Sequence, residues 1–174
     1  DARRRRSRHH RRPNCHDEIR MSEVEVVELS PAETYPLRLA VLRHDTPTKD
    51  VTFAEDSDPG AIHLGLRVAG ELVATSTWIP RPHNGQPAIQ LRGMATARQL
   101  QGTGLGGQLL EAGCARVATT GAQLVWARAR DAALDFYLRH EFDVVGDGFI
   151  DATTMLPHHL VVRHLIVRHQ VVRV

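Results

Sequence analysis

Hydrophobic and polar residues alternate over residues 62–68, and a second strand-like stretch follows at residues 72–79. Apolar side chains recur at every second position of the first stretch, at Ile62, Leu64, Leu66 and Val68. A period of two is typical of a strand that buries one face. Ala69-Gly70-Glu71 lies between the stretches and can turn the chain, so the pattern predicts a β-hairpin.

A capping-box pattern precedes these strands. Ser30-Pro31-Ala32-Glu33 places proline at the first helical position and glutamate three residues after serine. The apolar residues that follow predict a first helix to about Arg43, which Pro36 bends or shortens. Residues 44–60 are rich in Asp, Thr and Pro and predict an irregular connection of the kind that borders substrate pockets.

Helical spacing returns in the second half of the chain. A helix is predicted from Leu105 to about Thr120, where Gly121 ends it. Another is predicted to about Glu141, with Asp131 as its N-cap.

Further strands are predicted at residues 89–95 and 124–129, with residues 80–87 as a loop. A last strand begins near Val161 and completes the sheet. The resulting order is helix, hairpin, strand, helix, strand, helix, strand. This order predicts an α+β (mixed α/β) sheet covered by helices.

The composition fits one domain. The chain has 174 residues, of which 42% are hydrophobic and 24% charged, enough to bury one core. No apolar run approaches the ~18 residues of a membrane span, so we expect a cytoplasmic protein with no membrane partner. Cys15 and Cys114 lie in different settings, and no disulfide is expected. Cys114 is interpreted as a packing residue rather than a nucleophile.

Positive charge is concentrated at the start of the chain. Residues 1–20 contain eight arginines and three acidic residues, whereas the remainder contains 14 basic and 17 acidic residues. We interpret 1–20 as a disordered arginine-rich tail or as a leader before a native start at Met21, without weight for the fold. Non-specific binding of nucleic acid through this tail is the alternative. We place the domain at 21–165 and a C-terminal extension at 166–174.

The segment Gly102–Gly107 contains four glycines at the start of a predicted helix. Glycine admits backbone conformations that other residues avoid, and the first turn of a helix presents free N–H groups and a partial positive charge. This segment therefore predicts an anion site that binds a phosphate-bearing ligand.

Two nucleotide-binding motifs compete for this segment. Gly102-Thr103-Gly104-Leu105-Gly106-Gly107 fits G-x-G-x-x-G, the dinucleotide fingerprint. That fingerprint requires the first glycine directly after a strand, but residues 93–101 separate the predicted strand from Gly102. Too little chain follows for a doubly wound sheet, which disfavours this interpretation.

The alternative spacing, Gln101-x-x-Gly104-x-Gly106, resembles the Q/R-x-x-G-x-G/A pyrophosphate loop of the GNAT superfamily of acetyl-CoA-dependent N-acetyltransferases. Leu91-Arg92-Gly93-Met94-Ala95-Thr96 resembles the central strand of that superfamily. Arg130-x-x-Ala133-x-x-Phe136-Tyr137 resembles its later strand-to-helix segment. The resemblance spans about residues 24–165.

The resemblance implies a central, mostly antiparallel twisted sheet of about six to seven strands flanked by about four helices. It implies acetyl-CoA as co-substrate. The implied cofactor-binding residues are Met94, Ala95, Thr96, Gln101, Gly102, Thr103, Gly104, Leu105, Gly106, Gly107 and Arg130. The implied catalytic residue is Tyr137, which in relatives lies near the sulfur and protonates the departing thiolate. Packing beside Phe136 is the alternative for Tyr137.

Three residues depart from the family pattern. Gln101 replaces the commoner arginine, Arg130 stands where many relatives have asparagine, and Glu141 replaces the usual glycine before Phe142. We expect a missing phosphate contact at Gln101 and a distorted helix end at Glu141.

The implied activity is direct transfer of an acetyl group to a primary amine of a small molecule or peptide. A module that binds CoA with little turnover is the alternative. No general base is assigned, because His63 and His158 are also consistent with structural histidines. His158, His159 and His164 lack a spaced carboxylate or cysteine partner, so no metal is expected. Dimers are common among relatives, so a homodimer is one expected assembly, and no specific nucleic acid is expected as a partner.

Overall fold

A computed structural model describes residues 23–165 of the chain. Our interpretations of residues 1–20 and 166–174 lie outside the described residues. Within residues 23–165, none of the helices combines the length and the apolar character that a membrane span requires.

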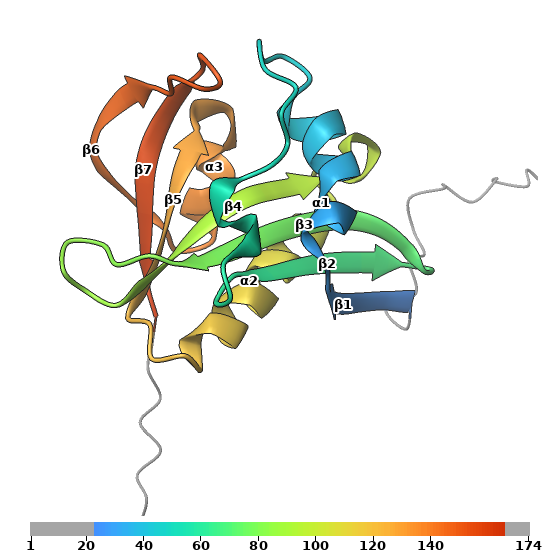
Figure 1. The fold of residues 1–174 in the computed structure, drawn as a ribbon, viewed down its shortest axis with the longest axis horizontal. Coiled ribbons are helices and arrows are strands. Elements are labelled where there is room, and N and C mark those ends of the chain that lie inside the picture. The colour runs from blue at the N-terminus through green and yellow to red at the C-terminus, as the bar shows by residue number, and fades with distance from the viewer. Residues whose placement is uncertain (1–22, 166–174) are drawn as a thin grey trace, which may run out of the picture.

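One seven-stranded sheet organises residues 23–165, in the order β1-β2-β3-β4-β5-β7-β6 (Figure 1). The strands are β1 (Val24–Glu28), β2 (Ile62–Val68), β3 (Glu71–Pro80), β4 (Ala88–Thr96), β5 (Leu124–Arg130), β6 (Asp143–Ile150) and β7 (Pro157–His164). Neighbouring strands are antiparallel except for β4 and β5, which are parallel. The predicted α+β class, strand number and mostly antiparallel pairing are confirmed.

The predicted number of about four helices is wrong for the described residues. They form three α-helices: α1 (Pro31–Leu37), α2 (Leu105–Ala118) and α3 (Leu134–Arg139). In Figure 1, α1 lies in front of the sheet and α2 lies behind it. The π-helical turn Arg38–Leu42 continues α1 instead of forming a separate helix.

The hydrophobic pattern missed two strands, β1 and β6. Both lie at the edges of the sheet, and each pairs with only one neighbour. Seven of the eight residues of β6 are exposed, so this strand has no buried face to impose a period of two. An edge strand of this kind is invisible to an analysis based on alternation.

The first helix begins as predicted but changes its winding. Glu33 accepts hydrogen bonds from the backbone N–H of Ser30, at 2.8 Å, and from its hydroxyl, at 2.9 Å. Pro36 lies inside α1, and α-helical winding ends one residue later. Because proline has no N–H to donate, it weakens the hydrogen-bond ladder just before the wider π turn.

The start of the last helix corrects one prediction. Asp131 begins a 3₁₀ turn and does not cap α3, whose N-cap is Ala133. Instead, the Asp131 carboxylate contacts Nδ1 of His159 at 2.8 Å. The helix ends at Arg139, two residues earlier than predicted.

Glu141, two residues after the end of α3, adopts the conformation that is usual for glycine at this position, so the predicted distortion of the helix end is wrong. Glu141 has a φ of 62°, the left-handed conformation that glycine adopts freely. The N–H groups of His140 and Phe142 both donate to the Tyr137 carbonyl, at 3.0 and 3.1 Å. These hydrogen bonds show that the helix end is not distorted. Strain is confined to Glu141 itself.

Replacing Glu141 with glycine should therefore stabilise the protein by about 0.5–1 kcal/mol. Relief of the left-handed strain, about 1–2 kcal/mol, exceeds the loss of the exposed Glu141–Arg163 ion pair and the added chain entropy. Urea unfolding measures the change. Glu141→Ala is the control, since it loses the ion pair but keeps the strain and should not stabilise.

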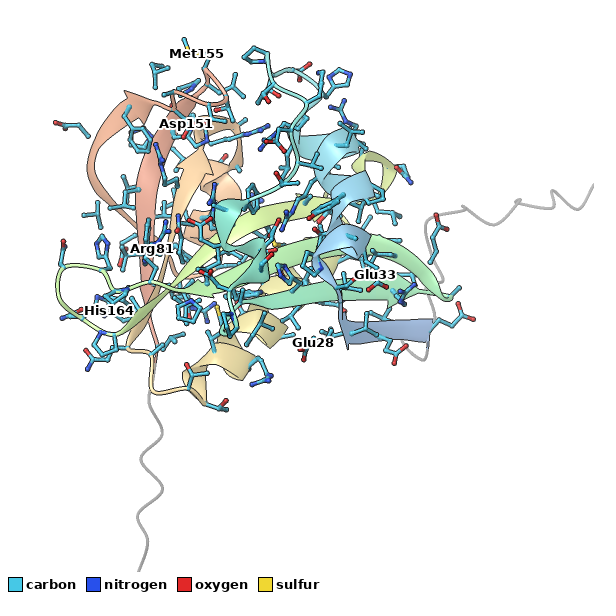
Figure 2. The ribbon with its side chains drawn as sticks, viewed as in Figure 1. Glu28, Glu33, Arg81, Asp151, Met155 and His164 are labelled. Carbon is cyan, nitrogen blue, oxygen red and sulfur yellow. The ribbon has the colours of Figure 1, made fainter. Side chains whose placement is uncertain are left out.

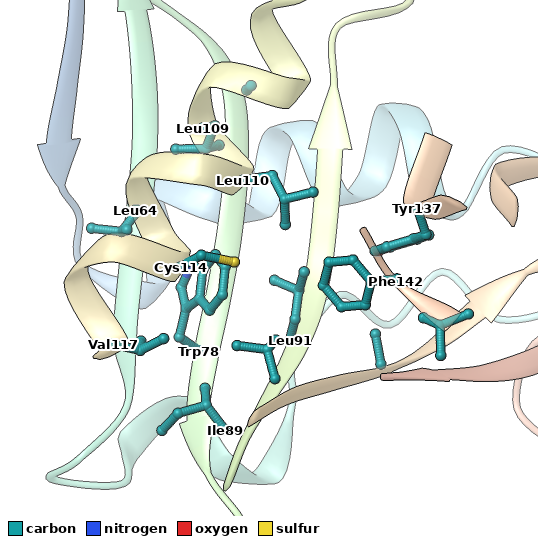
Figure 3. Packing of buried hydrophobic residues seen from close by; sticks show 14 of the residues in the cluster. Leu64, Trp78, Ile89, Leu91, Leu109, Leu110, Cys114, Val117, Tyr137 and Phe142 are labelled. Carbon is teal, nitrogen blue, oxygen red and sulfur yellow. The ribbon is translucent and has the colours of Figure 1, made fainter. Parts of the chain in front are cut away.

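An apolar core fills the space between the sheet and α2 (Figure 3). Trp78 of β3 is fully buried, and its indole lies against the α2 backbone at Gly113. A Cβ atom at Gly113 would lie 1.8 Å from the Trp78 ring, so only glycine permits this close packing. The core thereby fixes α2, and the glycine segment at its start, against the sheet.

The opposite face of the sheet holds a buried polar network. Arg38, which is 1% exposed, makes two hydrogen bonds with the Asp56 carboxylate, at 2.8 and 2.9 Å. It also donates to Thr77 Oγ1 at 2.7 Å and to the Val51 carbonyl at 2.9 Å. The network fastens the irregular segment 44–60, predicted from its composition, onto β3.

Asp56→Asn should lower the free energy of unfolding by about 2–3 kcal/mol, because the buried Arg38 charge loses its counter-ion. Burial raises the pKa of Asp56, but hydrogen bonds from Arg38 and the Phe53 N–H outweigh it and leave the pKa below the ordinary 3.8. The contribution is therefore present above pH ~4 and is lost as the pH falls through the folded-state pKa. Denaturant unfolding at pH 7 and pH 3 measures both effects. The exposed Asp58→Asn should change stability by less than about 0.5 kcal/mol.

Candidate active site

The parallel strands β4 and β5 separate along their length. They pair from Ala88 with Leu124 to Leu91 with Ala127, and no further. The register between β3 and β4 also shifts here, and Gly93 has a φ of 60°. This bulge leaves the β5-facing backbone of residues 92–96 without a strand partner, which opens the sheet at its centre.

A cavity of about 1020 Å³ occupies this opening. It brings together most of the residues that the sequence predicted for the cofactor, along with the predicted catalytic residue. These are Met94, Ala95, Thr96, Gln101, Gly102, Gly104, Gly106, Gly107, Arg130 and Tyr137. Thr103 and Leu105 do not line it: the Thr103 hydroxyl donates to the Leu100 carbonyl at 2.6 Å, and Leu105 is buried in the core.

The glycine segment forms one end of the cavity. Gly102 and Gly104 have φ values of 78° and 89°, and Gly104 is the N-cap of α2. The N–H groups of the first turn of α2 have no intrahelical acceptor, so they are available to an anion. A Cβ atom at Gly106 would lie 2.9 Å from Thr96 Oγ1, so a side chain here would displace Thr96 at the end of β4.

Gln101 is used to support this segment. Its Nε2 donates to the Thr96 carbonyl at 3.1 Å and ties the segment to the end of β4. Basic residues missed by the sequence analysis also line the cavity, namely Arg98, Arg139 and His140. The run of basic residues at the end of α3 was the available signal, but only the fold brings it opposite α2.

Tyr137 lies between the large cavity and the core. Its ring packs edge-on against that of Phe142, with centroids 5.2 Å apart (Figure 3). It packs in the same way against Phe136, with centroids 5.3 Å apart. Burial raises the pKa of the Tyr137 phenol well above its ordinary value of 10, so it remains protonated at neutral pH. Tyr137 can therefore act as a proton donor, and it also contributes to packing.

A second cavity, of about 250 Å³, lies beside the first. Five residues line both cavities: Leu42, Met94, Arg130, Ala133 and Tyr137. The small cavity is bordered by the irregular segment through Phe53 and by the β6–β7 connection through Asp151. A reacting pair held in the two cavities would meet near Met94 and Tyr137.

The candidate histidines have separate environments. His63 is buried between Thr77 Oγ1 and the Asp56 carbonyl, at 2.9 and 3.1 Å, as a structural histidine would be. His158 lines the small cavity, and its Nδ1 must donate to the Leu156 carbonyl at 2.8 Å. In neutral His158, Nε2 therefore carries the lone pair and can accept a proton.

In the described part of the chain, the histidines form no metal site and the cysteine is not a nucleophile. His159 contacts Asp131, whereas the neighbouring His158 stacks on Phe149, and residues 23–165 contain no group of three metal-ligating side chains. Cys114 is buried, and burial raises the pKa of its thiol to about 11. A neutral buried thiol is consistent with a packing role.

Comparison with known proteins identifies the family. Residues 25–142 match the profile described as "Acetyltransferase (GNAT) family". An uncharacterized N-acetyltransferase of Bacillus subtilis, YitI, is 29% identical over 132 residues, covering 72% of this chain and 87% of the relative. The fold matches that of Escherichia coli ElaA with a TM-score of 0.66 at 19% identity, covering 80% of this chain and 99% of the other. An aminoglycoside 6′-N-acetyltransferase complexed with coenzyme A matches with a TM-score of 0.64 at 14% identity, covering 82% and 97%.

The profile match covers more than half of the chain, and it agrees with the residues that suggested the family from sequence. The chain therefore belongs to the GNAT family and is an N-acetyltransferase.

Proposed function

We propose that residues 21–165 form an acetyltransferase domain that transfers an acetyl group directly from acetyl-CoA to a primary amine. The observation that carries the proposal is the large cavity, which joins the glycine segment, the open end of β4 and Tyr137. The structural neighbour complexed with coenzyme A supports the choice of ligand.

The glycine segment has the chemistry that a diphosphate requires. Free N–H groups at the start of α2 donate to phosphate oxygens, and the α2 dipole favours negative charge there. Arg98, Arg139 and His140 border the same cavity and add donors that Gln101 does not provide. Gln101 keeps a supporting role through the Thr96 carbonyl.

The open edge of β4 suits an extended ligand arm. Backbone groups of Met94, Ala95 and Thr96 on this edge lack a strand partner and can pair with amide groups of a ligand, as an added strand does. An N–H at this position can also donate to a carbonyl oxygen as negative charge develops on it.

Bound acetyl-CoA supplies an activated thioester, whose C–S bond breaks as a C–N bond to the amine forms. Tyr137 holds a proton on its phenol oxygen for the departing sulfur. Burial makes this phenol a weaker acid, and the same dry environment makes a thiolate more basic, which keeps the two groups matched. The amine must lose a proton. His158 lines the small cavity and, in its neutral form, has a free lone pair on Nε2 that can accept this proton.

A thiol-release assay tests the proposal. The protein is incubated with acetyl-CoA and a panel of primary amines, and free thiol and acetylated product are measured together. The proposal expects amine-dependent thiol release with one acetylated product per thiol. Binding of acetyl-CoA without product from any amine would instead favour a CoA-binding module.

A further inference from the structure

The small cavity has an unusually cationic lining. Five arginines face it: Arg43, Arg81, Arg92, Arg128 and Arg130. Glu55 holds two of them, with Oε2 2.7 Å from Arg92 Nη1 and Oε1 in contact with Arg81. Asp151 holds a third, with Oδ2 2.9 Å from Arg128 Nη2 (Figure 2 labels Arg81 and Asp151). Two carboxylates therefore form ion pairs with three of the five guanidinium groups.

The remaining two arginines have no carboxylate within 4.0 Å among residues 23–165. Arg43 is 8% exposed, and it donates from Nε to the Asp50 carbonyl at 2.5 Å and from Nη1 to the Leu42 carbonyl at 3.4 Å. Arg130 Nη2 donates to the same Leu42 carbonyl. Two positive charges thus converge on one neutral acceptor.

This arrangement costs free energy in the absence of a ligand. Burial lowers the pKa of the Arg130 guanidinium, and the nearby charge of Arg43 lowers it further. Carbonyl oxygens accept hydrogen bonds but do not neutralise charge. The carboxylates of Asp45, Asp50 and Asp151 lie more than 4.0 Å from the two guanidiniums and compensate the pair only in part. An anion placed between the two guanidiniums would offset this repulsion and could form bidentate hydrogen bonds.

The pair lies where an acceptor substrate would sit. Leu42 and Arg130 line both cavities, as do Met94 and Tyr137, and Arg43 lines only the small one. An anionic group held by the pair would therefore be close to the point where the cavities meet. A volume of about 250 Å³ is below the usual ~300–1,000 Å³ of drug-sized pockets and suits a small metabolite.

We infer that the acceptor is a small primary amine that also carries a carboxylate or phosphate, which Arg43 and Arg130 bind; this rests on the proposed function. The same charges repel polycations. Polyamines and aminoglycosides are therefore poor acceptors for this protein, although one structural neighbour is an aminoglycoside acetyltransferase.

The test compares amines that differ only in the anionic group. Each common amino acid is paired with its carboxamide, and O-phosphoethanolamine with ethanolamine; spermidine and kanamycin serve as polycations. At least one anionic amine should exceed its neutral twin in kcat/KM by about 10- to 100-fold, as expected for charge-assisted hydrogen bonds. Amidation lowers the pKa of an amino acid's amine and leaves more of it as free nucleophile, so this preference must come from binding. Comparison of the two series distinguishes a carboxylate from a phosphate.

Substitutions at Arg43 then test whether this residue causes the preference for anionic amines. Arg43→Gln should raise the KM of the preferred anionic amine by about tenfold or more, with less effect on kcat, and should abolish the preference over the neutral twin. Arg43→Lys should restore part of it, because the charge is retained without the planar fork. Acetyl-CoA affinity should stay within about twofold in both variants. Arg116→Gln removes an exposed charge from α2 outside both cavities and is the matched control.

The outcomes separate the two claims. Equal or better turnover of neutral or cationic amines would overturn the inference and leave the proposed function standing. If no amine is acetylated, the proposed function fails. The anion site is then tested separately, by the binding of an anion. Glutarate, an anion that lacks an amine, should raise the Tm of the protein in a saturable manner, whereas glutaramide should not. Loss of the glutarate effect in Arg43→Gln but not in Arg116→Gln would support the anion site, and no glutarate effect would overturn it.

Discussion

Gly104→Asp is expected to lower the affinity for acetyl-CoA about a thousandfold while the protein stays folded. The new carboxylate would stand at the N-cap of α2, beside the free N–H groups that the diphosphate needs. It would also repel the diphosphate, and a unit charge pair at 4 Å near a protein surface is worth about 4 kcal/mol. Calorimetric titration with acetyl-CoA measures the loss.

The opposite end of the same helix offers a matched control, Gly121→Asp. Gly104 and Gly121 have φ values of 89° and 84°, and an added Cβ would meet nothing within 4 Å at either position. Both substitutions therefore carry a similar conformational cost, about 1 kcal/mol, but Gly121 lies outside the cavity. Equal affinities for the two variants would remove the glycine segment from the binding site.

Tyr137→Phe is the second substitution with a large expected effect. Turnover should fall by about 10²- to 10⁴-fold, because the departing sulfur loses its positioned proton donor. Affinity for acetyl-CoA and the Tm should change little, since phenylalanine retains the ring contacts with Phe136 and Phe142. A fall in kcat without a matching change in KM is the kinetic signature.

A substitution of the neighbouring residue, Phe136→Leu, is the control for this prediction. Phe136→Leu removes a neighbouring aromatic ring that also borders the large cavity, but it does not remove a hydroxyl. It should alter stability and cofactor affinity more than turnover. Unchanged turnover in Tyr137→Phe would reduce Tyr137 to a packing residue.

The sequence predicted those parts of the site that lie close together along the chain. The glycine segment and the start of α2 follow from local conformation, and they occur where predicted. Residues 94–96 and Tyr137 were placed by family resemblance, and the fold brings both to one cavity. The hairpin was also predicted from the alternation in residues 62–68 and the turn at Gly70, although both of its strands bury residues on both faces.

Other features depend on contacts between distant segments and could not be predicted. The convergence of Arg43 and Arg130 on Leu42 joins residues 88 positions apart. Asp131 was assigned as a helix cap from local preference, but its contact with His159 comes from the neighbouring strand β7. Edge strand β6 lacked a pattern because most of its side chains are exposed. Long-range pairing decided each of these cases.

The central claim is that the opening between β4 and β5 binds acetyl-CoA through the main chain of the glycine segment. Calorimetric titration of the purified protein with acetyl-CoA, and separately with a nicotinamide dinucleotide, tests it most directly. We predict saturable binding of one acetyl-CoA per chain, competed by CoA, and no heat with the dinucleotide. Tight binding of the dinucleotide with no heat from acetyl-CoA would contradict the account.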